Sequence, residues 1–170
     1  MMSVYSLKFE KAFRYLISNE GGFADVSGDP GGKTKYGISQ KSYPYLDIEK
    51  LSLEESKKIY YRDFWLKGRC EEIEDELLAI QVFDFSVNLG IRNATISLQR
   101  ALRCQGINVQ EDGVWGAQTH SGVKNSDQRL LLVSLKSEVA GYYRLLVVKQ
   151  PSLNKFIKGW LNRAYRQIII

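Results

Sequence analysis

Apolar residues recur at helical spacing in the first part of the chain. Over residues 7–18, this spacing places Phe9, Phe13 and Leu16 on one face of the chain. Gly21 follows soon afterwards, and glycine ends helices readily because it adopts the left-handed conformation without steric cost. The pattern therefore predicts an amphipathic helix close to the N-terminus.

Four further helices are predicted downstream, each bounded by a capping residue or a glycine. The first begins at a capping box formed by Ser52 and Glu55 and ends near Gly68. The other three run from about Asp75 to Leu89, from about Asn93 to near Gly106, and from about Asp127 to Val148. Residues 112–116, which contain Asp112-Gly113 and Gly116, are expected to form a loop. Pro151 and Gly159 are expected to break up the C-terminal segment.

Residues 23–38 interrupt the helical pattern with turn-forming residues. The glycines and proline concerned are Gly28, Pro30, Gly31, Gly32 and Gly37. This composition is typical of turns with short strand or hairpin pieces, and it is too rich in glycine for a packed core. The predicted fold class is therefore mainly α (α+β), with a small Gly-rich β or loop region near the N-terminus.

Composition narrows the possible functions without choosing one. With 44% hydrophobic residues among 170, the chain has enough apolar material for a core that needs no disulfide framework or structural metal. The net charge of +5 suits a polyanionic partner such as nucleic acid, an anionic membrane or a bacterial envelope, and equally a surface that serves solubility. No nucleic-acid-binding motif or dense Lys/Arg stripe is present, so we expect no nucleic-acid partner.

Histidine and cysteine are too few for several kinds of site. His120 is the only histidine, which argues against a histidine-based zinc site or a Ser-His-Asp triad. Cys70 and Cys104 match no metal-binding spacing. We interpret them as free, partly buried thiols, with a single disulfide as the alternative. No metal and no organic cofactor is expected.

The N-terminal residues 1–16 mix charged with apolar side chains and contain no apolar core of a secretory signal. No run is long enough for a transmembrane helix, so we expect no stable membrane insertion. The chain is expected to be made in the cytoplasm without a signal peptide. Action on a cell wall or in the periplasm would then require release or export by other means. No pattern in the sequence indicates an oligomeric state.

Candidate chemistry begins where the first predicted helix ends. The partial negative charge of a helix C-terminus disfavours an ionised carboxylate at Glu20, and this effect raises the carboxyl pKa as a general acid requires. Asp29, in the glycine-rich segment, is a candidate second carboxylate, and Asp25 is its rival. Thr34 offers a hydroxyl that could hold a water molecule. A solvated glutamate at a helix end and an aspartate that caps a turn are the ordinary alternatives.

Several strings of residues resemble those of one known family. The opening block of glycoside hydrolase family 108 resembles two strings of this chain, Glu20-Gly21-Gly22 and the run from Asp29 to Ser39. The members of this family are bacterial and prophage lysozyme-like N-acetylmuramidases of the "secretion activator" type. The order Glu, Asp, Thr also resembles phage-type lysozymes, with a gap one residue shorter before Thr34. The family commonly has Thr where this chain has Ser39, which keeps the hydroxyl. Residues 83–90 resemble the central helix that lines the family's cleft.

The second half of the chain has a resemblance of its own. Residues 112–116 with Thr119, together with residues 159–163, resemble the predicted peptidoglycan-binding region that follows the catalytic block in this family. The resemblance implies a lysozyme-like catalytic region over residues 1–92 and a helical peptidoglycan-binding region over residues 93–170, packed as one compact unit. Simple packing of a helical lobe explains the apolar spacing in the second half equally well.

The resemblance also implies an activity and a site. The expected reaction is hydrolysis of the β-1,4 bond between N-acetylmuramic acid and N-acetylglucosamine in peptidoglycan glycan strands. Glu20 would be the general acid, while Asp29 with Thr34 would position a water molecule or stabilise charge. The expected substrate contacts are Phe23, Tyr36, Asp84 and Asn88. A lytic transglycosylase acting on the same bond, or a non-catalytic wall-binding or secretion-assisting protein, are the alternatives.

Overall fold

The computed structural model describes residues 5–19 and 33–169, and its elements are mainly helical, as predicted. The helices are α1 (Leu7–Asn19), α2 (Leu53–Tyr60), α3 (Glu76–Leu89), α4 (Ile91–Cys104), α5 (Ala117–Asn125), α6 (Gln128–Lys149) and α7 (Ile157–Tyr165). Three shorter helical stretches are η1 (Tyr61–Leu66), η2 (Cys70–Glu72) and η3 (Pro151–Phe156), and the strands are β1 (Thr34–Lys35) and β2 (Ile38–Ser39). The mainly α class with a small β region is confirmed.

Local capping signals place the helix boundaries close to their predicted positions. The predicted capping box is present at the start of α2, where Ser52 Oγ accepts from Glu55 N at 3.2 Å and Glu55 Oε2 accepts from Ser52 N at 2.8 Å. Asp75 caps α3 by accepting from Leu78 N at 2.8 Å. Asp127 caps α6 in the same way. These side chains satisfy backbone N–H groups that the first helical turn leaves unpaired.

Three stretches differ from the prediction. The helix expected to reach Gly68 changes after Tyr60 to the π-helical stretch η1. Helix α5 follows the expected loop and was not predicted, because its nine residues carry no apolar periodicity; it packs closely through Gly122. Gly159 does not break the chain but is the third residue of α7. Pro151 begins η3, a position where its missing N–H costs nothing.

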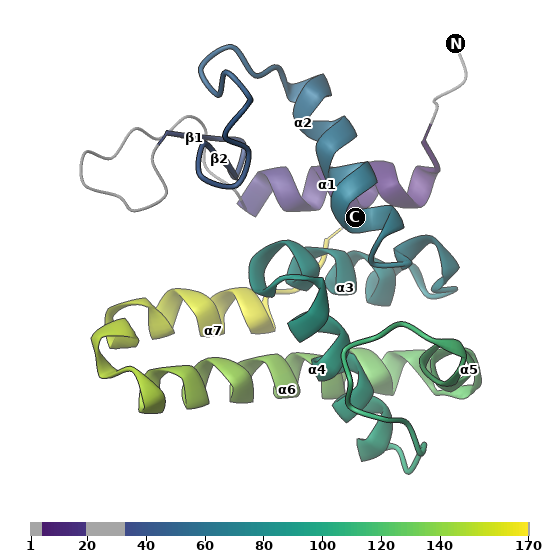
Figure 1. Ribbon diagram of the computed structural model, residues 1–170. Coiled ribbons are helices and arrows are strands. Elements are labelled where there is room, and N and C mark those ends of the chain that lie inside the picture. Colours follow the sequence, from purple (N-terminus) through teal and green to yellow (C-terminus); the bar gives the residue numbers. More distant parts are fainter. Residues whose placement is uncertain (1–4, 20–32, 170) are drawn as a thin grey trace.

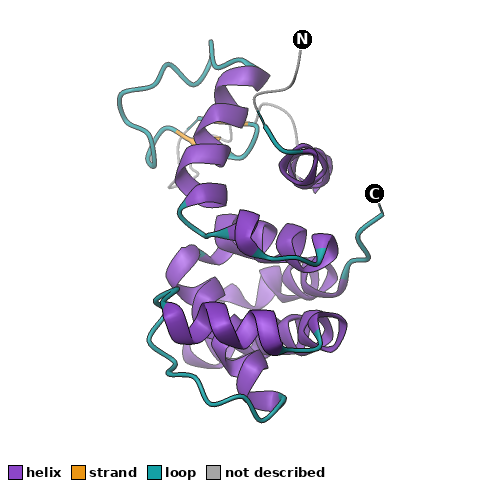
Figure 2. Cartoon of the chain, turned by 90° about the vertical axis from the view of Figure 1, so that its right-hand side faces the viewer, coloured by secondary structure: helices purple, strands orange, loops and turns teal. Residues whose placement is uncertain are grey.

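Helix α3 occupies the centre of the molecule. In Figure 1 it lies between an upper group, formed by α1, α2 and the two strands, and a lower group that includes α4, α5, α6 and α7; Figure 2 shows the same arrangement from the side. Every residue of α3 from Leu78 to Ser86 is buried, because α1, α4 and α6 all pack against it. A helix covered on all sides needs mainly apolar residues all round, as α3 has apart from the buried Gln81, Asp84 and Ser86.

An aromatic cluster fills the space between α1, η1 and α3. The ring of Phe9 lies 4.8 Å from Tyr61, 5.4 Å from Trp65 and 5.9 Å from Phe83, measured between ring centroids. The indole N–H of the buried Trp65 donates to Glu71 Oε2 at 2.7 Å. Such tilted and edge-to-face contacts add to the burial of large rings, so this cluster is the core of the first half.

The C-terminal segment connects the lower group to the upper one. The ring of Trp160 in α7 stacks on Tyr143 of α6, with centroids 5.1 Å apart. Beyond α7, Ile168 packs against the core and Ile169 lines a small hollow together with Tyr15 of α1. Helix α7 and its tail therefore contact elements from both halves of the chain.

Both cysteines are free thiols, as interpreted from the sequence. Cys70 is buried and Cys104 is exposed, so the expected partial burial is wrong for both. Burial raises the pKa of the Cys70 thiol far above its ordinary value, which keeps it protonated and unreactive. Over residues 5–19 and 33–169, no helix has the length and apolar character needed to cross a membrane.

Candidate active site and cleft

The predicted catalytic pair and one predicted sugar contact fall outside the described residues. These are Glu20, Asp29 and Phe23. Helix α1 ends at Asn19, so the described chain stops immediately before Glu20 and resumes at Lys33. The remaining predicted site residues lie on two elements, the hairpin of β1 and β2 and the second half of α3.

The hairpin holds Tyr36 in an uncommon backbone conformation. Tyr36 and Gly37 form the turn and have φ angles of 52° and 78°. Turns of this kind favour Asn-Gly or Gly-Gly, because a bulky side chain at positive φ is strained. The hydroxyl of Tyr60 donates to the carbonyl oxygen of Tyr36 at 2.8 Å, and this bond from a buried side chain fixes the turn. Strained residues of this type are often found at functional sites.

Thr34 and Ser39 face each other across the hairpin. The antiparallel register pairs Thr34 with Ser39 and Lys35 with Ile38. Ser39 Oγ accepts from Ser42 N at 3.2 Å and lies 2.9 Å from Ser42 Oγ, so this hydroxyl stabilises the turn that follows β2. The half-buried Thr34 lies one residue pair from the turn that carries Tyr36, which brings these two predicted residues to the same small element.

A bidentate ion pair joins the centre of α3 to α7. Arg163 Nη2 donates to Asp84 Oδ1 at 2.9 Å and Arg163 Nε donates to Asp84 Oδ2 at 3.2 Å. With its side-chain oxygen turned toward the guanidinium, Asn88 accepts from Arg163 Nη2 at 2.9 Å and from Nη1 at 2.7 Å. Asp84 and Asn88 are one helical turn apart on α3, so both reach the same guanidinium. We call these three residues the arginine clamp.

The structure changes the role expected for Asp84. Its side chain has 0% exposure and forms the ion pair with Arg163, whose side chain is 18% exposed. A direct contact between Asp84 and substrate therefore conflicts with its burial. Asn88, by contrast, is exposed and stays a candidate contact. The sequence did contain a signal for this pair, because a carboxylate between Phe83 and Phe85 in an apolar helix requires a cationic partner.

Further polar groups lie near the clamp on α6. The hydroxyl of Tyr143 is buried and has no hydrogen-bond partner among the described residues, and burial raises its pKa to about 12. Burial lowers the pKa of Lys136, while the charge of Asp84 opposes this shift. Lys136 Nζ also donates to the carbonyl oxygen of Arg166 at 2.8 Å, which ties α6 to the end of α7. The Asp84 side of the clamp thus has little access to water, whereas Asn88 is exposed.

A hollow of about 390 Å³ opens beside the clamp. Its lining consists of one residue of α3 and five residues of α7 and its C-terminal end: Asn88, Gly159, Trp160, Asn162, Arg163 and Arg166. The lining combines amide groups, cations and an aromatic ring. These groups suit a polar ligand that carries amide or carboxylate oxygens.

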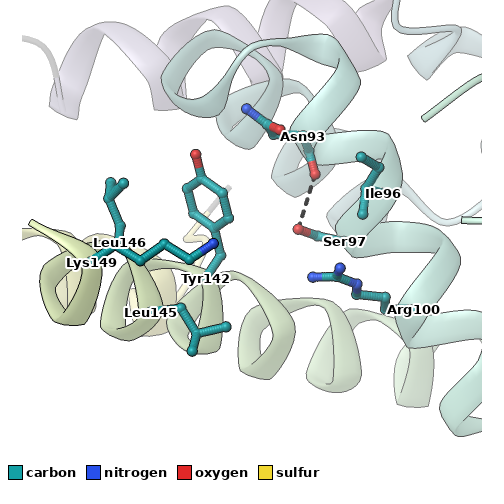
Figure 3. A pocket seen from close by; sticks show the side chains of 8 residues that line it. All are labelled: Asn93, Ile96, Ser97, Arg100, Tyr142, Leu145, Leu146 and Lys149. Atoms are coloured by element: carbon teal, nitrogen blue, oxygen red, sulfur yellow. Dashed lines mark hydrogen bonds between the residues drawn. The ribbon is translucent and has the colours of Figure 1, made fainter. Parts of the chain in front are cut away.

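A second hollow, of about 220 Å³, lies between α4 and α6. Its lining residues are Asn93, Ile96, Ser97, Arg100, Tyr142, Leu145, Leu146 and Lys149. Figure 3 shows the Tyr142 ring, the Arg100 guanidinium and the Lys149 ammonium directed toward the same gap. Arg100 also pairs with Glu111 at 3.0 Å. An aromatic ring beside cations is a suitable surface for an anionic sugar polymer.

The motif at residues 112–116 is held in place by a buried glutamine. Gln99 Nε2 donates to Asp112 Oδ1 at 2.8 Å and to Thr119 Oγ1 at 3.1 Å, while Gln99 Oε1 accepts from Gly113 N at 2.9 Å. Gly113 has a φ of 74°, and a Cβ there would lie 2.6 Å from the side chain of Arg92. The motif therefore has a structural role, since it fixes the loop between α4 and α5 against α4.

The described residues contain no candidate metal site. Within residues 5–19 and 33–169, no group of three or more His, Cys, Asp or Glu side chains is placed to hold a metal ion. His120 instead lies beside Glu72, with its Nδ1 3.0 Å from Glu72 Oε2.

Comparison with known proteins identifies both halves of the chain. The family model described as Glycosyl hydrolase 108 matches residues 13–90, and the model described as Predicted Peptidoglycan domain matches residues 93–165. The solved structure of Brucella abortus SagA is similar, with a TM-score of 0.74 and 26% sequence identity over 92% of this chain and 88% of that chain. No curated protein shows a significant match. Residues 13–90 therefore match glycosyl hydrolase family 108 and residues 93–165 match a predicted peptidoglycan domain. At the level of these families, the two matches support a glycoside hydrolase that acts on peptidoglycan.

Proposed function

We propose that the chain hydrolyses the β-1,4 bond between N-acetylmuramic acid and N-acetylglucosamine, with Glu20 as the general acid. The observation that carries this proposal is the match of residues 13–90 to glycosyl hydrolase family 108. The matched segment contains Glu20, Asp29 and Thr34, in the order expected for a lysozyme-like site. The match of residues 93–165 to a predicted peptidoglycan domain supports the same substrate.

In the proposed reaction, Glu20 gives its proton to the glycosidic oxygen as the bond from that oxygen to the anomeric carbon breaks. A water molecule adds to the anomeric carbon as the new hydroxyl, and its other proton passes to a carboxylate of the site, either Asp29 or the ionised Glu20. Asp29 together with Thr34 positions this water molecule or stabilises the positive charge that develops on the sugar ring. The proposal requires no metal ion and no organic cofactor.

Two features of the described residues support these roles. Glu20 follows directly on the last residue of α1, where the helix dipole disfavours a charged carboxylate and favours the protonated acid. Thr34 and Tyr36 lie on a hairpin whose turn is fixed by the buried Tyr60. Polar groups held on a rigid support are suited to orienting a substrate.

The test is digestion of purified peptidoglycan with the wild type and with Glu20→Gln. Glutamine has the same shape but carries no proton that it can donate, so glycan cleavage should fall by about 10²–10⁴-fold. Glu54→Gln, a change at an exposed glutamate of α2, is the matched control and should retain full activity. Equal thermal unfolding of both variants would show that the loss does not come from misfolding.

Mass spectrometry of the products distinguishes the alternatives. Hydrolysis yields muropeptides with a reducing end, each one water heavier than an anhydro product. Exclusive formation of anhydro-muropeptides would identify a lytic transglycosylase and reject the hydrolase. Full activity in folded Glu20→Gln would reject Glu20 as the acid. Absence of cleavage by the wild type would favour a non-catalytic wall-binding protein.

A further inference from the structure

The positive charge of the chain is concentrated in its last part. Residues 139–170 contain six Lys or Arg and no acidic residue, whereas residues 1–138 contain 18 Lys or Arg and 19 Asp or Glu. The basic segment comprises the second half of α6, η3 and α7 with its tail. A distribution as uneven as this one creates a positive potential over one part of the surface and favours an anionic partner there.

Four of these cations surround the connection between α6 and α7. They are Arg144, Lys149, Lys155 and Lys158, which are all exposed, and none of them forms an ion pair with a carboxylate among the described residues. We call residues 144–158 the basic tip. In Figure 1 this connection lies at the left edge of the molecule, at the opposite end of α6 from α5. The charges of the basic tip are therefore available to a partner.

The basic tip also exposes apolar side chains. Near its end, α6 has four consecutive apolar residues, Leu145, Leu146, Val147 and Val148. Because 3.6 residues make one helical turn, such a run covers the helix on every side. Helix α7 packs along α6, yet Leu145 and Val148 remain 57% and 75% exposed, and Phe156 in η3 is 45% exposed. Single exposed apolar residues are ordinary, whereas a cluster of them rimmed by charges indicates an interaction surface.

The combination of cations and apolar side chains selects among possible partners. A nucleic acid or an anionic wall polymer would pair with the cations, but it would leave Leu145, Val148 and Phe156 in water. A second copy of the chain would place one set of cations against another, which is unfavourable. An anionic lipid surface suits both groups, because its phosphates attract the cations and its acyl boundary accepts the apolar side chains.

We propose that the basic tip binds the chain to an anionic lipid surface. Val148 and Phe156 enter the boundary between headgroups and acyl chains, while Lys155 and Lys158 pair with lipid phosphates. This contact is peripheral and reversible, and over residues 5–19 and 33–169 no helix is long and apolar enough to cross a membrane. Lipid binding does not depend on the proposed cleavage of glycan strands, but it would hold that activity at an envelope membrane.

Cosedimentation of the protein with lipid vesicles tests the charges of the tip. Vesicles made of equal parts of phosphatidylglycerol and phosphatidylcholine should bind the wild type, whereas vesicles of phosphatidylcholine alone should not. The double variant Lys155→Gln with Lys158→Gln should lose roughly 10- to 30-fold in partition coefficient, because each cation near an anionic surface contributes about a fivefold factor. Lys41→Gln with Lys124→Gln removes the same charge from exposed positions outside the tip and should lose at most about twofold.

Val148→Ser tests the apolar part of the tip. Valine and serine have similar helix propensities and Val148 is exposed, so thermal unfolding should stay unchanged. Loss of a side chain that enters the lipid boundary should weaken binding to the anionic vesicles by roughly 3- to 10-fold. Val133→Ser is the matched control, because Val133 is 64% exposed on the same helix and lies about 22 Å from Val148 along its axis. Its replacement should leave vesicle binding unchanged.

Three results would overturn the lipid-binding tip. The first is no binding of the wild type to the anionic vesicles, and the second is an equal loss in the tip variants and their controls. The third is unchanged binding in Val148→Ser while the lysine variant loses binding, which would identify a general polyanion site instead. If the wild type binds vesicles but cleaves no peptidoglycan, the lipid-binding tip stands and the proposed hydrolase fails. If it cleaves peptidoglycan without binding vesicles, the hydrolase stands and the tip fails.

Discussion

Removal of the Arg163 guanidinium should destabilise the fold more than the loss of an exposed ion pair. In Arg163→Met, the carboxylate of Asp84 keeps its charge at 0% exposure but loses its bidentate partner. Loss of one partner from a buried ion pair costs about 3–5 kcal/mol, because the remaining charge loses its bidentate counter-charge in a low-dielectric interior. A folded domain is stable by only about 5–15 kcal/mol, so this single change removes a large part of the total.

The exposed pair between Lys50 and Asp47 provides the contrast. Their side chains are 87% and 53% exposed, and Lys50→Met should therefore cost no more than about 1 kcal/mol. The double variant Asp84→Leu with Arg163→Met should recover most of the loss, since it removes the buried carboxylate together with its cation. Urea denaturation followed by circular dichroism would give the four free energies of unfolding, provided that the slope with urea stays constant.

Two results of this double-mutant cycle would contradict a stabilising ion pair between Arg163 and Asp84. If Arg163→Met loses less than about 1 kcal/mol, the guanidinium does not compensate the charge of Asp84. If the double variant is as unstable as the sum of the two single changes, the two side chains are not coupled. Either result would refute the assignment of the clamp as a buried ion pair that ties α7 to α3.

Two other predictions concern ionisation and wall binding. Burial raises the pKa of Tyr43 and Tyr143 to about 12, above the ordinary value of 10.0. The neutral phenols therefore stabilise the fold fully below about pH 10. This stabilisation is lost as the pH rises toward about 12. Tyrosinate absorbance should show a late-titrating fraction that disappears when both residues are changed to phenylalanine, and a single transition near pH 10 in the wild type would contradict this. Lys149→Glu should weaken sedimentation of the Glu20→Gln protein with purified sacculi, because it reverses a charge in the hollow between α4 and α6. Equal loss in Lys124→Glu, an exposed charge reversal on α5, would show that only net charge matters.

The sequence was informative where structure depends on neighbouring residues. The capping residues Ser52, Asp75 and Asp127 each act within three residues of their own position, so local patterns were enough to place three helix starts. The short hairpin near Tyr36 was likewise expected from turn-forming residues. Local information failed for α5, whose nine residues are held by contacts with distant side chains and not by their own apolar pattern.

The candidate site required information that no local pattern contains. Arg163 and Asp84 are 79 residues apart in the sequence, and only the folded chain brings them together. Residues 159–163 resembled a family segment, but the spacing gave no reason to connect them with the central helix. The hollow lined by Asn88 and α7 could not be predicted for the same reason, since its two walls come from different matched segments.

The changed role of Asp84 has a consequence for how the two segments work together. Asp84 orients Arg163, Arg163 orients the amide of Asn88, and Asn88 lines the hollow. Asp84, which was expected to touch substrate, instead holds Arg163, a residue supplied by the predicted peptidoglycan domain. Without α7, Asp84 would be a buried charge with no guanidinium, and Asn88 would lose its orientation. The predicted peptidoglycan domain thus contributes a structural ion pair to the central helix of the glycosyl hydrolase segment.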